Sequence, residues 1–189
     1  GCGSGLFEYF LKTDYNIAIR EGLEPSTRMA DIASKRGMEV TIGAIEQTDL
    51  GRGIYDTILF NGTPSYISDL ETAFEKSYYA LKEGGKIVVI DVPKEGSFAL
   101  LYNLAKTVGT WDHPLFRDVK PQAVYPIEFV KDANWRTTFE KVDLLKKMGF
   151  KNYRFAQTLT KHPLYANEEF EEPIEGYEKG DYVAICANK

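Results

Sequence analysis

Gly1-Cys-Gly-Ser-Gly5 opens the chain, and the rest of the sequence is arranged around this glycine-rich stretch. Such a run typically joins a strand to a helix, because glycine adopts backbone conformations closed to other residues and lets a ligand lie directly on the backbone. The helix that follows is indicated by apolar residues spaced along one face: Leu6, Phe7, Phe10 and Leu11. The strand that normally precedes such a turn is missing, so we expect an N-terminally incomplete domain.

Strands and helices alternate through the first half of the chain. Apolar or β-branched runs predict strands at Asn16–Glu24, Met38–Ile42, Tyr55–Phe60 and Lys86–Val92. Helices are predicted from Ser26 to Arg36, and from a capping box at Ser68–Glu71 to Gly84-Gly85. This alternation predicts an α/β fold with a Rossmann-like, doubly wound and mostly parallel sheet. Ligands of such sheets bind beyond the carboxyl ends of the strands.

The pattern loosens at about residues 96–135, which we interpret as a cap-like insertion within a single domain of residues 1–189. A helix is predicted again over Thr137–Met148. Its inward side chains are expected to be Phe139, Val142, Leu145 and Met148. Two strands, Asn152–Thr160 and Asp181–Ala187, close the chain, with an acidic loop over residues 168–179 between them. We therefore expect these two strands to pair antiparallel.

The composition disfavours several classes of function. The chain has 189 residues, 43% of them hydrophobic and 27% charged, as in an ordinary soluble domain. Its net charge of −5 disfavours binding to the phosphate backbone of nucleic acids. No apolar run approaches the roughly 20 residues of a membrane span, and Cys2 and Cys186 lack the spacing of a metal site. We expect a cytoplasmic protein that binds neither nucleic acid nor metal and has no membrane span.

Six segments of the chain, in order, resemble those of class I S-adenosylmethionine-dependent methyltransferases that act on small molecules such as quinone precursors. They are Gly1–Gly5, Gly22–Ser26 with Met29, Gly43–Glu46, Tyr55-Asp56, Ala80–Gly85 and Met148–Phe150. The resemblance implies transfer of the sulfonium methyl of S-adenosylmethionine to a small-molecule acceptor by in-line displacement, with S-adenosylhomocysteine as product. The chain departs from the family at Ala44, where many relatives place an aspartate toward the adenine amine; Glu46 or backbone groups are the alternatives.

The chemistry of this cofactor assigns roles to the same segments. The glycines permit close backbone approach, and Glu24, about 20 residues further on, is placed to accept both ribose hydroxyls. Pro25, Met29 and Ile45 are candidates for the faces of the adenine. The full set of predicted cofactor-binding residues is Gly1, Cys2, Gly3, Ser4, Gly5, Glu24, Pro25, Ser26, Met29, Ala44, Ile45, Glu46, Phe60, Asn61 and Gly62.

Acceptor binding is expected to depend on aromatic residues, because aromatic-lined sites suit flat or apolar small molecules. The predicted substrate-binding residues are Tyr66, Tyr102, Trp111 and Tyr125. A general base is needed only if the acceptor arrives protonated, as a phenol would. The candidates for that catalytic role are Tyr66, His113 and Glu128, and none of them stands out.

Each of these assignments has a structural alternative. Glu24 is also suited to stabilise a helix dipole, Met29 to fill the core, and the aromatic rings to hold an extra helix on the sheet. A noncatalytic subunit with the methyltransferase fold remains open, as does a homodimer. An NAD(P)-dependent oxidoreductase is disfavoured, because Gly1–Gly5 followed by Leu6 gives GxGxG rather than GxGxxG.

Overall fold

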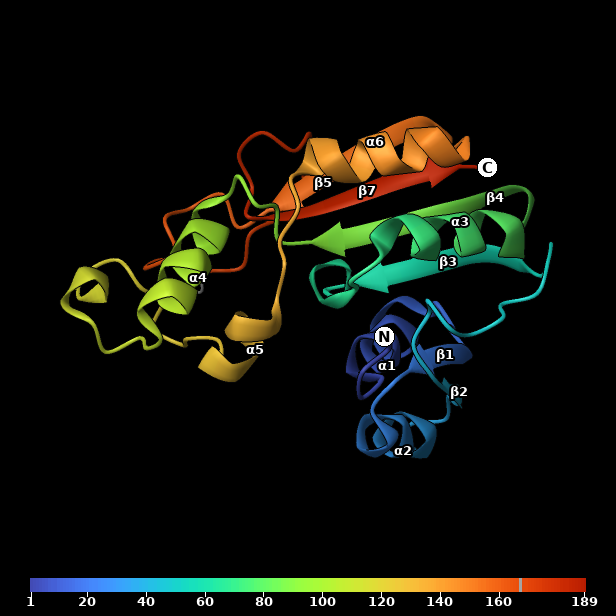
Figure 1. The fold of residues 1–189 in the computed structure, drawn as a ribbon, viewed down its shortest axis with the longest axis horizontal. Helices are drawn as coiled ribbons and strands as arrows, with labels where there is room; N and C mark the ends of the chain where they lie inside the picture. Colours follow the sequence, from blue (N-terminus) through green and yellow to red (C-terminus); the bar gives the residue numbers. More distant parts are fainter. Residues whose placement is uncertain (167) are drawn as a thin grey trace. The chain divides into compact units, whose positions relative to one another are not determined.

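The structure, a computed structural model, describes residues 1–166 and 168–189. The chain divides into two units, Gly1–Gly51 and Arg52–Lys189, which are described separately. Figure 1 colours both units along the sequence. Within the described residues, none of the helices combines the length and the apolar character that a membrane span requires.

The first unit contains two helices and two parallel strands. Its elements are α1 (Leu6–Tyr15), β1 (Glu21–Glu24), α2 (Thr27–Lys35) and β2 (Glu39–Ile42). The strands run in register from Glu21 opposite Glu39 to Glu24 opposite Ile42. The Ser26 side chain caps α2 by accepting from the Met29 amide, so the predicted start of this helix is confirmed. The strand predicted from Asn16 begins only at Glu21, because Asn16 adopts a left-handed conformation that ends α1.

The second unit is a mixed five-stranded sheet with the order β3-β4-β7-β5-β6. Its elements are β3 (Tyr55–Asn61), η1 (Pro64–Tyr66), α3 (Leu70–Ala80), β4 (Leu81–Asp91), α4 (Ser97–Val108), η2 (Pro114–Phe116), α5 (Ile127–Asp132), α6 (Thr138–Met148), β5 (Lys151–Thr158), β6 (Ile174–Glu175) and β7 (Tyr182–Asn188). β3 and β4 are parallel, whereas β7 is antiparallel to both β4 and β5. The predicted α/β fold with an antiparallel carboxyl-terminal pair is confirmed.

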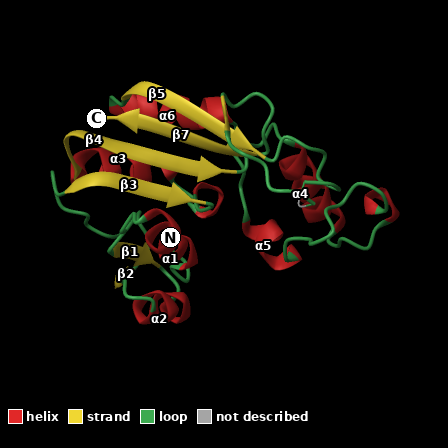
Figure 2. Ribbon diagram, turned by 180° about the vertical axis from the view of Figure 1, so that it is seen from behind, coloured by secondary structure: helices red, strands yellow, loops and turns green. Residues whose placement is uncertain are grey.

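One face of this sheet carries the core of the second unit. Buried and half-buried residues alternate along β4 and β7, as they must when only one face is fully covered. The buried set on these two strands includes Ile87, Val89, Val183 and Ile185. Helices α3 and α6 lie side by side on one face of the sheet, in front of the strands in Figure 1 and behind them in Figure 2.

Beyond the carboxyl ends of β3 and β4 lie α4 and α5, which belong to the segment predicted as a cap (Figure 1). The segment has a hydrophobic cluster of its own. Its buried members are Ala99, Ala105, Trp111, Phe116, Val130, Ala133 and Trp135. The Trp111 indole nitrogen donates to the Tyr125 carbonyl at 2.8 Å, which ties the start of α5 to the chain that follows α4.

Three further details of the sequence prediction are wrong. Helix α3 is capped by Asp69 rather than Ser68, because the Asp69 carboxylate accepts from both the amide and the hydroxyl of Thr72. The same helix ends at Ala80 instead of Gly84-Gly85, since Leu81 is already fully buried in β4. In α6, Phe139 is 72% exposed, not inward.

The buried face of α6 differs from the predicted face, and the start of the helix explains the difference. Thr137 and Glu140 form a capping box that sets where the helix starts. From that start, Thr138, Lys141, Val142 and Leu145 are buried, so the predictions for Val142 and Leu145 are confirmed. A further difference lies in the acidic loop, part of which forms β6 and pairs with β5.

Candidate functional site

The opening turn, Gly1–Gly5, lies against strand β1. The Cys2 amide donates to the Leu23 carbonyl at 3.0 Å, and the Gly5 amide donates to the Cys2 carbonyl at 3.0 Å. A Cβ on Gly22 would stand 2.6 Å from the Cys2 sulfur. Glycine is therefore needed at position 22 because the turn packs directly on the strand.

Glu24 joins the end of β1 to the opening turn. Glu24 is only 7% exposed. One carboxylate oxygen accepts from the Gly3 amide at 2.9 Å and the other from the Ser26 amide at 3.0 Å. Each carboxylate oxygen has a second acceptor position. The two places that the sequence links, the glycine turn and the acid after the next strand, thus meet within the first unit.

The turn is anchored at one end and open in the middle. Gly5 has a φ of 67°, and a Cβ there would lie 2.8 Å from the Met38 sulfur and 3.1 Å from the Ala33 Cβ. Gly3 has a φ of 55°, and a Cβ there would meet nothing within 4 Å. The space beside Gly3 and the carboxylate of Glu24 together form the part of this unit that is best suited to a ligand lying on the backbone.

The other cofactor residues predicted in this unit lie at the ends of the same two strands. Pro25, Ser26 and Met29 are exposed at the start of α2, with Met29 exposed by 41%. Ala44, Ile45 and Glu46 are half-buried in the turn after β2. The amide of Gly43, which begins that turn, donates to the Glu24 carbonyl at 3.1 Å. The backbone therefore connects the turn after β2 to Glu24.

Glu8 is a residue of this region that sequence reasoning missed. It lies in the first turn of α1 and is only 8% exposed. Among the residues that the structure describes, none hydrogen-bonds to its Oε2 atom. Burial raises the pKa of Glu8. An acid in the first turn of a helix is ordinarily an exposed partner of the helix dipole, so the sequence carried no signal of this burial.

In the second unit, four tyrosines gather where β3 and β4 end; we call Tyr66, Tyr102, Tyr125 and Tyr182 the tyrosine cluster. The Tyr66 hydroxyl donates to the Tyr125 hydroxyl at 3.2 Å. The ring centroids of Tyr102 and Tyr125 are 6.0 Å apart. The Tyr182 hydroxyl donates to Oδ1 of Asn61, the last residue of β3, at 2.7 Å. The structure thus brings together the predicted acceptor residues Tyr66, Tyr102 and Tyr125, with Tyr182 as an addition.

The remaining residues predicted for this unit have other surroundings. Trp111 is 7% exposed and packs on Phe116 at a centroid distance of 5.0 Å, so it is a core residue of the cap. His113 caps η2 by accepting from the Leu115 amide, and Glu128 is exposed in the first turn of α5. Phe60 is buried against Phe74 of α3, 5.7 Å between ring centroids.

Three tyrosines of the cluster, Tyr66, Tyr102 and Tyr182, remain protonated at neutral pH. Burial, with the charge of nearby groups, raises the pKa of Tyr102 and of Tyr182 to about 12. Burial and the hydrogen bond to Tyr125 also raise the pKa of Tyr66. A tyrosine with a pKa this high is a poor general base at neutral pH. These three residues therefore offer neutral hydroxyls and ring faces to a ligand.

These pKa values predict a loss of stability in alkali. The pKa of an unfolded tyrosine is about 10, so between about pH 10 and pH 12 the folded state holds more protons than the unfolded state. The free energy of unfolding should then fall as the pH rises, by at most about 2–3 kcal/mol for each of Tyr102 and Tyr182. Urea unfolding at about pH 9 and about pH 11.5 measures this fall.

Matched variants isolate the share of one residue. Tyr182→Phe should make the alkaline part of the profile shallower while Tyr102 keeps its own share, whereas Tyr79→Phe, at a 45% exposed position on α3, should leave the profile unchanged. An equally steep profile in Tyr182→Phe would show that the Tyr182 hydroxyl does not contribute to it.

Beneath the cluster lies a buried ion pair that sequence reasoning also missed. Lys141 Nζ stands 3.3 Å from Asp91 Oδ2, and the two side chains are 2% and 3% exposed. Asp91 Oδ1 accepts from the Ser65 hydroxyl at 3.2 Å. Burial raises the pKa of Asp91, and the Lys141 ammonium partly offsets that rise. The pair connects β4 and α6 to η1, which carries Tyr66.

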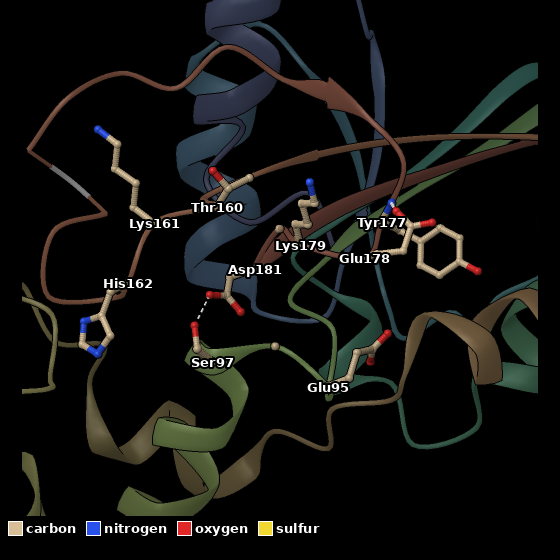
Figure 3. Close-up of a pocket in the computed structure, with 11 residues that line it drawn as sticks. Glu95, Ser97, Thr160, Lys161, His162, Tyr177, Glu178, Lys179 and Asp181 are labelled. Atoms are coloured by element: carbon tan, nitrogen blue, oxygen red, sulfur yellow. Dashed lines mark hydrogen bonds between the residues drawn. The ribbon is translucent and has the colours of Figure 1, made fainter.

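A polar hollow of about 330 Å³ lies elsewhere in the second unit, at the beginning of α4 (Figure 3). Two of its three carboxylates, Asp181 and Glu95, bind the amides at helix starts. Asp181 accepts from the Ser97 hydroxyl and from the Phe98 amide, both in the first turn of α4. Glu95 accepts from the Thr138 amide at the start of α6. Asp181 and Glu95 thus stabilise the starts of α4 and α6.

The sequence of this chain is similar to those of known proteins. A family profile described as "Methyltransferase domain" matches residues 1–89. The chain is 30% identical over 189 residues to an uncharacterized protein of Methanocaldococcus jannaschii, covering 100% of this chain and 80% of that protein. It is 27% identical over 188 residues to an uncharacterized protein of Mycobacterium tuberculosis, covering 99% of this chain but only 58% of that protein.

A solved structure matches the whole chain. It is the crystal structure of an S-adenosylmethionine-dependent methyltransferase from Thermotoga maritima, described as a possible histamine N-methyltransferase. The identity is 34%, the TM-score is 0.81, and the match covers 100% of this chain and 78% of that one.

Proposed function

Because the chain belongs to the class I S-adenosylmethionine-dependent methyltransferases, we propose that it transfers a methyl group from S-adenosylmethionine to a small-molecule acceptor. When bound, this cofactor supplies a methyl group on a sulfonium that is already activated toward nucleophiles. The protein's contribution is then to bind, to orient and to exclude water, and orientation of this kind supplies up to roughly 7–11 kcal/mol.

The observation that carries the proposal is the contact between the Gly3 amide and the Glu24 carboxylate. The adenosyl group fits the residues present, because the space above Gly3 is open and Glu24 retains acceptor positions for a pair of ribose hydroxyls. We propose that Gly1–Gly5 holds the aminocarboxypropyl part of the cofactor, and that Pro25, Met29 and Ile45 contact the adenine.

Other assignments also remain proposals. Ser26, Ala44 and Glu46 are assigned to the adenosyl part, and Phe60–Gly62 to the methionine part. Residues 1–189 are proposed to act as one methyltransferase domain in the cytoplasm. A noncatalytic subunit would bind the cofactor without turnover, so a methylation assay with labelled S-adenosylmethionine separates it from an enzyme.

Glu24→Ala should weaken the binding of S-adenosylhomocysteine by roughly 5- to 150-fold, which corresponds to about 1–3 kcal/mol for hydrogen bonds to a charged acceptor. Isothermal titration calorimetry measures this change directly. The matched control is Glu39→Ala, which removes an exposed glutamate from β2 of the same unit and should leave the affinity unchanged. Wild-type affinity in Glu24→Ala would remove Glu24 from the cofactor site.

A further inference from the structure

The tyrosine cluster is open to solvent on one side. Tyr66 and Tyr125 are each 40% exposed, and Phe129, whose ring centroid is 5.7 Å from that of Tyr125, is 49% exposed. The other two members, Tyr102 and Tyr182, are half-buried. Large aromatic side chains are costly to leave in water, so an exposed group of them that shares polar contacts is a candidate binding surface.

The hydroxyl groups of the cluster present more acceptors than donors. The proton of Tyr66 is directed to the Tyr125 oxygen, and the proton of Tyr182 to Asn61 Oδ1. A hydroxyl has one proton and two lone pairs. With these two protons committed, the oxygens of Tyr66 and Tyr182 are left as acceptors, and they favour a ligand that donates hydrogen bonds.

A carboxylate lies close to the cluster. Burial is the main cause of the raised pKa of Tyr66 and of Tyr182, and the charge of Asp91 adds to the rise at both. Lys141 pairs with Asp91 and offsets part of that charge. Arg136 donates to the carbonyls of Pro64, Ile67 and Ser68. The ring faces and hydroxyl oxygens are therefore the main features of the cluster that favour a cation.

We propose that the tyrosine cluster is the acceptor site and that the acceptor is a small organic amine. This inference rests on the proposed methyl transfer. Ring faces attract ammonium groups, and the Tyr66 and Tyr182 oxygens accept from the nitrogen that bears the charge. Asn61, held by Tyr182, adds a polar group at the end of β3.

The transfer step accounts for the proton and the charge of an amine. An amine bound as its ammonium first loses one proton to water, which frees its lone pair. The lone pair then forms the nitrogen–methyl bond as the carbon–sulfur bond breaks, and positive charge passes from sulfur to nitrogen. Tyrosine rings and hydroxyl oxygens stabilise the charge that develops on nitrogen. A phenol reacts as its phenolate, so no positive charge develops on its oxygen for these groups to stabilise.

A matched pair of probes tests the charge preference. Choline and 3,3-dimethylbutan-1-ol have nearly the same shape, but only choline is a cation. Titrated by NMR in the presence of S-adenosylhomocysteine, choline should bind at least about tenfold more tightly than the alcohol. Tyr66→Ala and Tyr125→Ala each remove an exposed ring of the cluster and should reduce choline binding several-fold, whereas Tyr79→Ala should not. Equal affinity for the two probes, or choline binding unaffected by both cluster variants, would overturn the proposal.

A transfer assay tests the acceptor itself. With labelled S-adenosylmethionine, 2-phenylethylamine should be methylated and 4-ethylphenol should not. Methylation of the phenol alone would contradict the amine assignment while leaving the methyltransferase proposal intact. Failure of S-adenosylhomocysteine to bind the wild-type protein would instead contradict the proposed function, so the two failures are distinguishable.

Discussion

Replacing Lys141 by alanine is expected to lower the free energy of unfolding by about 3–5 kcal/mol, the cost of leaving one member of a buried ion pair without its partner. The Lys141 and Asp91 side chains are 2% and 3% exposed, so the Asp91 carboxylate would be left in the core without its cationic partner. Ser65 would remain the only side chain described as bonded to Asp91. Urea unfolding followed by circular dichroism measures the change.

Two further variants separate the charge from the packing. Lys147→Ala removes a lysine from the same helix whose pair with Asp143 is about half exposed, and it should change stability by no more than about 1 kcal/mol. Replacing both Lys141 by Met and Asp91 by Leu should recover most of the stability, because a well-packed apolar pair has no uncompensated charge. A loss below about 1 kcal/mol in Lys141→Ala would mean that the pair is not needed for the fold.

Gly3→Val should reduce the binding of S-adenosylhomocysteine by about 100-fold or more while the protein still folds. A Cβ at Gly3 would meet nothing within 4 Å, so the valine side chain would extend into open space. It would instead occupy the place proposed for the ligand. The φ of 55° adds strain of roughly 1–3 kcal/mol, which lowers stability without removing the fold.

The chain offers a matched control for that strain. Gly37 lies in the same unit, has a φ of 91° and likewise has nothing within 4 Å of a Cβ. Gly37→Val should therefore show a similar loss of thermal stability and normal ligand affinity. If both valine variants lose affinity equally, the effect comes from strain, and the opening turn is not the binding surface.

Most helices and strands were predictable, because capping residues and the spacing of apolar residues act over only a few positions. The Ser26 hydroxyl caps α2 as expected, and the capping residue Thr137 precedes α6 at the predicted place. The sequence linked the glycine turn to the acid after the next strand as two parts of one site, but it did not predict the direct hydrogen bond between Gly3 and Glu24. The end of α3 was missed because burial of Leu81 in β4 overrides its helical propensity.

Residues of the candidate site were harder to predict when their partners lie far apart in sequence. Tyr66 and Tyr125 were identified by type, but their contact depends on how the cap folds. Tyr182 was overlooked because its partner Asn61 is 121 positions away. The Lys141–Asp91 pair could not be predicted from the sequence, because an isolated lysine on a helix is ordinarily exposed.

Calorimetric titration of the protein with S-adenosylhomocysteine and, separately, with NADPH distinguishes a methyltransferase from an oxidoreductase. A methyltransferase that holds its cofactor on Gly1–Gly5 should bind S-adenosylhomocysteine saturably at a single site that depends on Gly3 and Glu24, and it should not bind NADPH. Binding of NADPH without binding of S-adenosylhomocysteine would rule out the methyltransferase assignment.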